Sequence, residues 1–381
     1  TPSLEAYSHA CDGEYLLVKL NARYEERPLP QVSIVDLREE LKKGNRSVLS
    51  LELKRDLEQV LERREQAMLF LNRRGYAGFV SCRACGHVMK CPHCDVSLSE
   101  HNGNRLICHY CGYETVKPEI CPSCGSPHIG GLPSSPLPCF RAAARKRVEK
   151  VIEKEFPKAR VLRMDFDTTR TKDSYEKILA SFAKHEADIL VGTQMIVKGH
   201  DFPNVTLVGV IAADLSLNMD DYHCGERTFQ LLTQAVGRSG RGNRPGQAVI
   251  QTYQPEHYSI QAAAIQDYKK FYKEEMGYRM LLDYPPAAHM MTVFGACQDE
   301  ELLKNAMYYI EVFIRRVSPK EELHMIGPAA ASVGKVKDVY RQVIHLKHRD
   351  ICFLTAVREK LEKYIEINSG FRKIYIQFDM N

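Results

Sequence analysis

Apolar and polar residues follow strand and helix periods in turn along the first part of this chain. Alternation within residues 14–37 predicts strands at 15–20 and 32–36, and residues 67–71 (AMLFL) predict a short buried strand. Between them, Ser50 suits the N-cap of a helix. The apolar positions of that helix share one face: Leu53, Leu57, Val60 and Leu61.

Strands and helices alternate again after residue 147. The run at 205–211 is almost wholly apolar, as expected of a parallel strand covered on both faces. The predicted strands are 161–164, 189–191, 205–211 and 248–251, and the predicted helices are 173–184, 226–238 and one that ends at Phe156. This alternation predicts one doubly wound α/β domain with a parallel sheet.

Beyond about residue 284 the predicted order changes to β-α-β-β-α-β. The six elements are 291–297, 299–316, 323–326, 343–346, 351–365 and 374–378. This order is typical of a small ferredoxin-like α+β domain. Tyr284, Pro285 and Pro286 mark a natural boundary before it.

Eight of the 13 cysteines interrupt the alternating pattern as four C-x-x-C pairs. The pairs are Cys82 with Cys85, Cys91 with Cys94, Cys108 with Cys111, and Cys121 with Cys124. Two pairs complete a tetrahedral zinc site with four thiolates, so four pairs predict two zinc ions. Glycine follows the second cysteine of three pairs, at Gly86, Gly112 and Gly125, where the chain must turn sharply.

A disulfide framework is the alternative interpretation of these cysteines. It is disfavoured because no signal peptide precedes them and the remaining cysteines are scattered, which suits a reducing cytoplasm. The pairing of the C-x-x-C units stays open between a nested and a sequential arrangement. Three histidines lie nearby, His87, His93 and His109, and we interpret them as turn residues rather than ligands.

Composition narrows the classes of partner. The chain has 381 residues, 44% of them hydrophobic, and no apolar run approaches the ~20 residues that span a bilayer, so we expect a soluble protein without a membrane partner. A net charge of +5 permits nucleic-acid binding without proving it. Lys335, Lys337 and Arg341 flank Tyr340 and could track phosphates beside a stacked base, although a solvated hairpin has the same composition.

Two segments of the α/β domain carry candidate chemistry. Residues 192–201 follow a buried strand and are expected at its carboxyl end, where open α/β sheets bind ligands. Residues 234–242 lie at the end of a predicted helix and hold Arg238 and Arg241 three positions apart. Two arginines presented in this way can pair with phosphate and stabilise a transferring phosphoryl group. Taken alone, the second segment could equally be a basic turn.

Together these segments resemble motifs V and VI in the second, RecA-like lobe of superfamily 2 helicases. Thr193, Gly199 and Asp201 match motif V, and Gln234, Gly237, Arg238 and Arg241 match motif VI. With the four C-x-x-C pairs, the chain resembles more narrowly the bacterial primosomal replication-restart helicases. Thr1, Pro2 and Ser3 are similar to the end of that family's motif III.

The resemblance implies an ATP-dependent 3′-to-5′ DNA helicase that restarts stalled replication forks and initiates primosome assembly. Arg238 and Arg241 would be catalytic and face the ATP phosphates, and Thr193 would touch DNA, as would Lys335, Lys337 and Arg341. The residues implied near the nucleotide are Gln234, Gly237, Gly199 and Asp201. The implied ligands are two zinc ions and ATP with Mg²⁺. The implied partners are forked and single-stranded DNA, primosome proteins and single-stranded DNA-binding protein, in the cytoplasm.

The same resemblance implies four regions. They are the first part of the helicase lobe (1–81), a zinc insertion (82–128), the rest of the lobe (129–283) and a DNA-binding domain (284–381). The expected fold is therefore α/β, a second helicase lobe with an inserted binuclear zinc module and a ferredoxin-like domain.

The chain departs from the family in two ways. It has no phosphate loop and no acidic Mg²⁺ motif, which the family places upstream of Thr1, so we expect a fragment without ATPase activity of its own. The family's G-x-G-T segment is also missing from residues 132–146, where three closely spaced prolines exclude an interior strand. A frameshift, a degraded copy and true divergence all remain open. A second hypothesis is therefore a zinc-dependent nucleic-acid or protein-binding module with a vestigial motor lobe.

Overall fold

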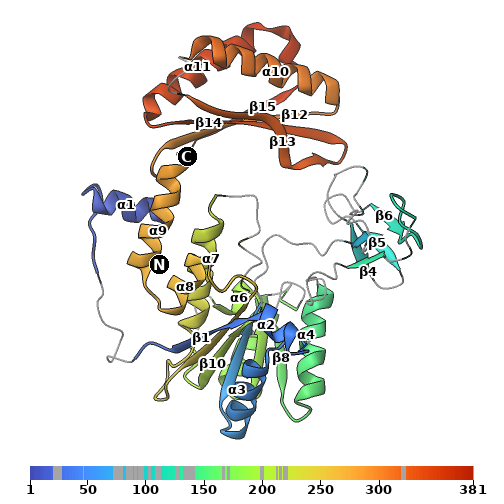
Figure 1. The fold of residues 1–381 in the computed structure, drawn as a ribbon, viewed down its shortest axis with the longest axis vertical. Helices are drawn as coiled ribbons and strands as arrows, with labels where there is room; N and C mark the ends of the chain where they lie inside the picture. The colour runs from blue at the N-terminus through green and yellow to red at the C-terminus, as the bar shows by residue number, and fades with distance from the viewer. Residues whose placement is uncertain are drawn as a thin grey trace. The chain divides into compact units, whose positions relative to one another are not determined.

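A computed structural model gives the fold of the chain as two compact units (Figure 1). One unit comprises 1–77 with 132–274, and the other comprises 78–131 with 275–381. The structure describes residues 1–19, 28–45, 47–71, 80–82, 89, 92, 98–101, 104–107, 113–125, 127, 129–131, 142–164, 168–169, 172–197, 201–211, 213, 217, 222–318 and 323–380.

The first unit is built on a six-stranded parallel sheet in the order β1-β11-β10-β2-β9-β8. The strands are β1 (Gln31–Asp36), β2 (Gln66–Phe70), β8 (Val161–Met164), β9 (Ile189–Gly192), β10 (Val205–Val210) and β11 (Gln247–Thr252). Every residue of β2, β9 and β10 is buried, which explains why their sequences are apolar except for Gln66 and Thr206. The predicted parallel α/β sheet is confirmed.

Helices connect these strands. They are α1 (Leu4–Cys11), α2 (Leu37–Lys42), α3 (Leu51–Glu62), α4 (Ala142–Glu155), α5 (Lys172–Ala183), α6 (Gln194–Val197), α7 (Cys224–Val236), α8 (Tyr258–Ala264) and α9 (Tyr268–Leu281). Ser50 caps α3 as predicted, because its Oγ accepts a hydrogen bond from the Leu53 backbone N–H at 3.2 Å. Leu53 and Leu57 of α3 and Ile152 of α4 lie fully buried in one core cluster with the sheet.

The predicted strand at 15–20 is wrong over residues 15–19, which form no regular element. Its apolar side chains face solvent, since Leu16 is 90% and Val18 is 72% exposed. Alternation there has no neighbouring strand to pair with, and without pairing an alternating sequence gains nothing from extended structure. Residue 20 lies outside the described residues.

The expected gap in the centre of the sheet is also absent from the described strands. β2, which precedes the cysteines, pairs with β10 on one side and β9 on the other. The central position is therefore filled by a strand that comes before residue 132. Residues 132–141 lie outside the described part of the chain, and α4 begins at Ala142.

The second unit contains a four-stranded antiparallel sheet in the order β13-β14-β12-β15. Its elements are β12 (His289–Cys297), α10 (Glu300–Val317), β13 (His324–Val336), β14 (Val339–His348), α11 (Ile351–Ile367), the 3-10 turn η3 (Ser369–Phe371) and β15 (Tyr375–Met380). This is the predicted β-α-β-β-α-β order. Both helices pack on one face of the sheet around a shared core (Figure 1).

The cysteine segment also belongs to the second unit and contains short strands. They are β3 (Val80–Cys82), β4 (Ser99–His101), β5 (Arg105–Ile107), β6 (Glu114–Val116) and β7 (Ile129–Gly131). β3 pairs with β7, so the two ends of the segment lie side by side. Among the described residues, no helix combines the length and apolar composition that crossing a bilayer requires.

Candidate functional site

The second predicted motif forms a loop at the amino edge of the parallel sheet. Helix α7 ends at Gly237, and the chain then returns to the start of β11. The loop is joined to the start of β10, because the Gly240 N–H donates to the Val205 carbonyl at 3.0 Å. The loop of residues 237–246, called the arginine loop below, therefore lies where the parallel strands begin.

The arginine loop brings together three residues that the sequence predicted. Arg241 Nη1 lies 3.5 Å from Asp201 Oδ1, and Arg241 Nε donates to the Gly237 carbonyl at 2.9 Å. Burial, together with the nearby charge of Arg241, lowers the pKa of the Arg238 guanidinium. Two cationic groups kept this close favour an anion between or beside them. Gln234 is exposed on the last turn of α7.

Glycine is required at the sharpest point of this loop. Gly240 has φ +67°, and a Cβ at this position would lie 2.5 Å from the Gly246 backbone nitrogen. The loop closes on itself there, so any side chain would push its two ends apart. Gly240 therefore allows the segment that carries Arg238 and Arg241 to lie close to the start of β11.

The first predicted motif is divided between opposite edges of the sheet. Thr193 directly follows β9 at the carboxyl edge, as predicted, and is buried. Asp201 lies shortly before β10, at the amino edge, because β10 begins at Val205. The structure therefore joins Asp201 to the arginines and keeps Thr193 apart from them. Gly199 lies outside the described residues.

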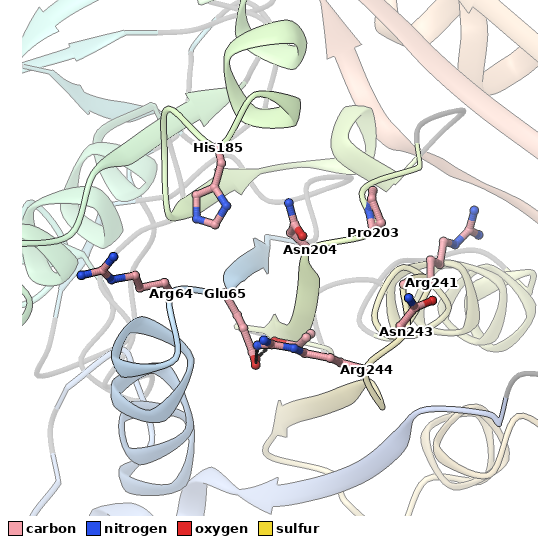
Figure 2. A pocket seen from close by; sticks show the side chains of 10 residues that line it. Arg64, Glu65, His185, Pro203, Asn204, Arg241, Asn243 and Arg244 are labelled. Atoms are coloured by element: carbon pink, nitrogen blue, oxygen red, sulfur yellow. Dashed lines mark hydrogen bonds and ion pairs between the residues drawn. The ribbon is translucent and has the colours of Figure 1, made fainter.

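A cavity of about 340 Å³ opens beside the arginine loop at the amino edge (Figure 2). Its walls come from the turns that precede β2, β9, β10 and β11, and they are mostly polar and basic. The lining residues are Arg64, Glu65, His185, Pro203, Asn204, Thr206, Arg241, Gly242, Asn243 and Arg244.

Sequence reasoning missed the contacts that hold this cavity together. Glu65, directly before β2, is buried and forms an ion pair with Arg244, and Thr206 Oγ1 donates to Glu65 Oε2 at 2.5 Å (Figure 2). One available signal was a charged residue, Glu65, placed directly before a strand whose residues 67–70 are all apolar. Parallel strands start at a common edge, so such residues are candidates for one site.

The predicted zinc ligands lie mostly outside the described residues, namely Cys85, Cys91, Cys94, Cys108 and Cys111. The described cysteines of the cluster are Cys82, in β3, and the pair Cys121 and Cys124. The Gly125 N–H donates to the Cys121 carbonyl at 2.8 Å and Gly125 has φ +70°, which is the tight turn expected after a C-x-x-C pair. Within the described part of the chain, no three potential ligands converge.

The predicted basic hairpin is the turn between β13 and β14. Lys335 Nζ donates to the Pro92 carbonyl at 2.9 Å, lies 3.4 Å from Asp338 Oδ1, and stacks over the Tyr340 ring at 4.7 Å. Lys337 is exposed in the turn itself, and the Arg341 guanidinium lies 6.0 Å from the Phe294 ring centre. Lys335 is therefore held within the hairpin by Asp338 and Tyr340 and by the Pro92 carbonyl.

The fold and the arginine loop are those of a helicase C-terminal lobe. Residues 140–243 match the family model described as helicase conserved C-terminal domain. Residues 91–115 match the model described as PriA DNA helicase Cys-rich region domain, a zinc ribbon, and this match supports zinc binding by the cysteine segment.

Curated relatives extend the match over the whole chain. Replication restart protein PriA of Bacillus subtilis is 44% identical over 383 residues, covering 100% of this chain and 46% of that protein. Its counterpart in Synechocystis sp. is 42% identical, covering 95% of this chain and 44% of that protein. The chain belongs to the family of replication restart protein PriA and corresponds to the C-terminal portion of these relatives. It spans about half their length.

Solved structures show weaker likeness. RecG bound to a three-way DNA junction has a TM-score of 0.40 and 13% identity, covering 75% of this chain and 26% of that one. Yeast Dbp5 bound to RNA and ADP BeF3 has a TM-score of 0.34 and 12% identity, covering 73% of this chain and 53% of that one.

Proposed function

We propose that this chain is part of an ATP-dependent 3′-to-5′ DNA helicase that restarts stalled replication forks and initiates primosome assembly. It would supply the second motor lobe, a zinc module and a C-terminal domain. The observation that carries the proposal is the arginine loop, where Arg238, Arg241 and Asp201 meet at one sheet edge inside a helicase C-terminal domain.

In this proposal Arg238 and Arg241 bind the ATP phosphates. The contact of Arg241 with Asp201 is long, at 3.5 Å, and 34% of the Arg241 side chain is exposed, so the guanidinium can exchange a carboxylate for a phosphate. Arg241 would then neutralise charge that develops on the transferring phosphoryl group. Gln234, Gly237, Gly199 and Asp201 would complete this side of the nucleotide site. ATP and Mg²⁺ supply the phosphoryl group and its counter-charge, and their principal ligands would come from outside this chain.

We further propose that the eight clustered cysteines bind two zinc ions. The turn at Cys121–Gly125 fits a zinc knuckle, since it presents two thiols from one tight bend. The nested arrangement of pairs is favoured by the pairing of β3 with β7, which holds Cys82 opposite Ile129, close in sequence to Cys124. Zinc would then fold the segment between these strands.

DNA would bind at two places in the proposed enzyme. Thr193 would contact the DNA backbone at the carboxyl edge of the sheet, away from the nucleotide residues. Lys337 and Arg341, with Lys335 positioned behind them, would contact DNA from the C-terminal domain, which we propose is ferredoxin-like and spans 284–381. The remaining regions would be lobe segments at 1–81 and 129–283 and a zinc module at 82–128. Primosome proteins and single-stranded DNA-binding protein would be partners, in the cytoplasm.

The test is ATP hydrolysis by a chimera in which this chain replaces the matching portion of the Bacillus subtilis relative. We expect hydrolysis stimulated by forked DNA, and a loss of about a thousandfold in kcat for Arg241→Ala. Arg227→Ala, on the exposed side of α7, is the matched control and should keep its rate. An Arg241→Ala chimera as fast as the parent would remove the proposed role. A chimera that binds DNA but never hydrolyses ATP would favour the vestigial-lobe alternative.

A further inference from the structure

A buried carboxylate lies behind the arginine loop, outside the residues assigned to the nucleotide. Glu65 is only 6% exposed, and both of its oxygens are engaged. Oε1 pairs with Arg244 Nη1, and Oε2 accepts from Thr206 Oγ1 at 2.5 Å. We propose that Glu65 is a positioning residue that holds the arginine loop and thereby aims Arg241. The effect of Glu65 on ATP hydrolysis rests on the proposed function, whereas its contact with the arginine loop does not.

Glu65 is itself held firmly by the sheet. It directly precedes β2, and the next residue, Gln66, donates its backbone N–H to the Asn204 carbonyl at 2.9 Å. The Gln66 side chain donates to the carbonyls of Phe182 and Ala187 at 2.8 and 2.7 Å. Three neighbouring segments thus fix the start of β2. A carboxylate at such a fixed backbone position can hold a loop in one place.

The arginine loop has other contacts near its two ends and at Gly242, whose backbone packs closely against Pro203. Its Gly240 N–H bonds to β10, and its last carbonyl, that of Gly246, accepts from the Gln31 N–H at 2.9 Å. Between these points the contact of Arg244 with Glu65 ties down the middle of the loop, three residues after Arg241 (Figure 2). Release of Arg244 would therefore free the stretch that carries Arg241 more than it would free the ends.

Charge explains why a carboxylate is used here. A buried carboxylate needs a paired cation and a hydrogen-bond donor, and Arg244 and Thr206 supply one each. Arg244 is 60% exposed, so its own burial is not what fixes it. Without the charge of Glu65, Arg244 would return to solvent and the loop would lose its central contact.

The first test measures hydrogen exchange in this chain itself. Glu65→Gln keeps the shape of the side chain and removes the charge, and we expect about tenfold faster exchange at the amides of residues 241–244. Glu62→Gln, an exposed glutamate three residues earlier on α3, is the matched control and should leave exchange unchanged. Unchanged exchange in Glu65→Gln would overturn the inference, whatever the chain does with ATP.

The second test uses the chimera described above. Glu65→Gln should lower kcat for ATP by about tenfold to a hundredfold with the KM for ATP changed by less than about twofold. In an Arg241→Ala background the same change should cost nothing further, because both act through one guanidinium. An additional loss in that background would mean that Glu65 acts on general stability, and would overturn the positioning role.

A second variant keeps the inference testable if Glu65→Gln does not fold. Arg244→Met removes the partner from a mostly exposed position. Thr206 still donates to Glu65, and uptake of a proton by Glu65 would leave no buried charge unpaired, so the chain should fold and kcat should fall as in Glu65→Gln. An unchanged kcat in Arg244→Met would contradict the inference. If Arg241→Ala itself has no effect, the proposed function fails, and hydrogen exchange alone then decides the role of Glu65.

Discussion

At the scale of single residues, the site depends on where the backbone places two arginines. Their spacing is set by the end of α7, and their distance from the sheet is set by the turn at Gly240. Arg238 loses hydration by burial, and Arg241 keeps partial exposure beside Asp201. The pair is thus arranged with one cation fixed in the loop and the other at its surface.

Replacement of Gly240 by alanine should destabilise the first unit. The positive φ costs about 1–2 kcal/mol for alanine, and the 2.5 Å approach to Gly246 adds a clash that the backbone must relieve. Gly44→Ala is the control, because Gly44 has φ +83° with nothing within 4 Å of its Cβ position. Thermal unfolding should show a clearly larger loss for Gly240→Ala. Equal losses would mean that the close approach to Gly246 contributes nothing.

Residues that are neighbours in sequence were the predictable ones. The spacing of Arg238 and Arg241 needs only the end of one helix, and both were identified. Glu65 was not, because its contact with Arg244 spans 179 residues and depends on the two strands β2 and β11 starting at a common edge. The split of Thr193 from Asp201 was missed for a related reason, since Thr193 follows the end of β9 and Asp201 precedes the start of β10, at opposite edges of a parallel sheet.

At the scale of elements, helix α1 docks on α7, which leads into the arginine loop, and on α9. The Leu4 N–H donates to Glu226 Oε1 of α7 at 3.0 Å, and Leu4 is buried. The Tyr7 ring lies edge-on to the rings of Tyr268 and Tyr272 in α9, with centroids 4.9 and 4.7 Å away. Aromatic contacts, rather than periodicity within α1, therefore hold this helix.

Tyr7→Ala should loosen α1 without disturbing the sheet. Two edge-on aromatic pairs are worth about 1–3 kcal/mol together, so amides of residues 4–11 should exchange roughly tenfold faster or more. Glu5→Ala, exposed on the same helix, should leave that rate unchanged. Equal exchange in both variants would show that the tyrosine contacts do not hold α1.

Regular elements of both sheets were predictable because the helices bury one periodic face and the inner strands of the parallel sheet are buried throughout. The strands β2, β9 and β10 and the helix α3 appear within a residue or two of their expected bounds. Helix α1 was not expected, because its partners on α7 and α9 lie at least 222 residues away in the sequence. The strand expected at 15–20 failed for the opposite reason, since its alternation is real but meets no second strand.

At the scale of the whole molecule, the chain combines a parallel sheet with a cysteine segment whose two ends are joined by the pairing of β3 with β7. The proposed zinc ions would stabilise this segment and leave the six-stranded sheet to its own core. Zinc loss should therefore weaken DNA and partner binding more than it affects the arginine loop.

Metal content tests the zinc assignment. The purified chain should contain about two zinc ions, and Cys124→Ser should lower that number. Cys352→Ser, an exposed cysteine of α11 outside the cluster, should leave it unchanged. In the chimera, chelation should reduce binding to forked DNA more strongly than ATP hydrolysis. A chain without zinc, or equal losses of both activities, would contradict this part of the account.

The central claim is that the arginine loop completes an ATP site whose other half lies outside this chain. The most direct measurement compares ATP hydrolysis, with and without forked DNA, by the purified chain and by the chimera. We predict no turnover by the chain alone and DNA-stimulated turnover by the chimera that requires Arg241. Turnover by the chain alone, or a chimera indifferent to Arg241, would contradict the account.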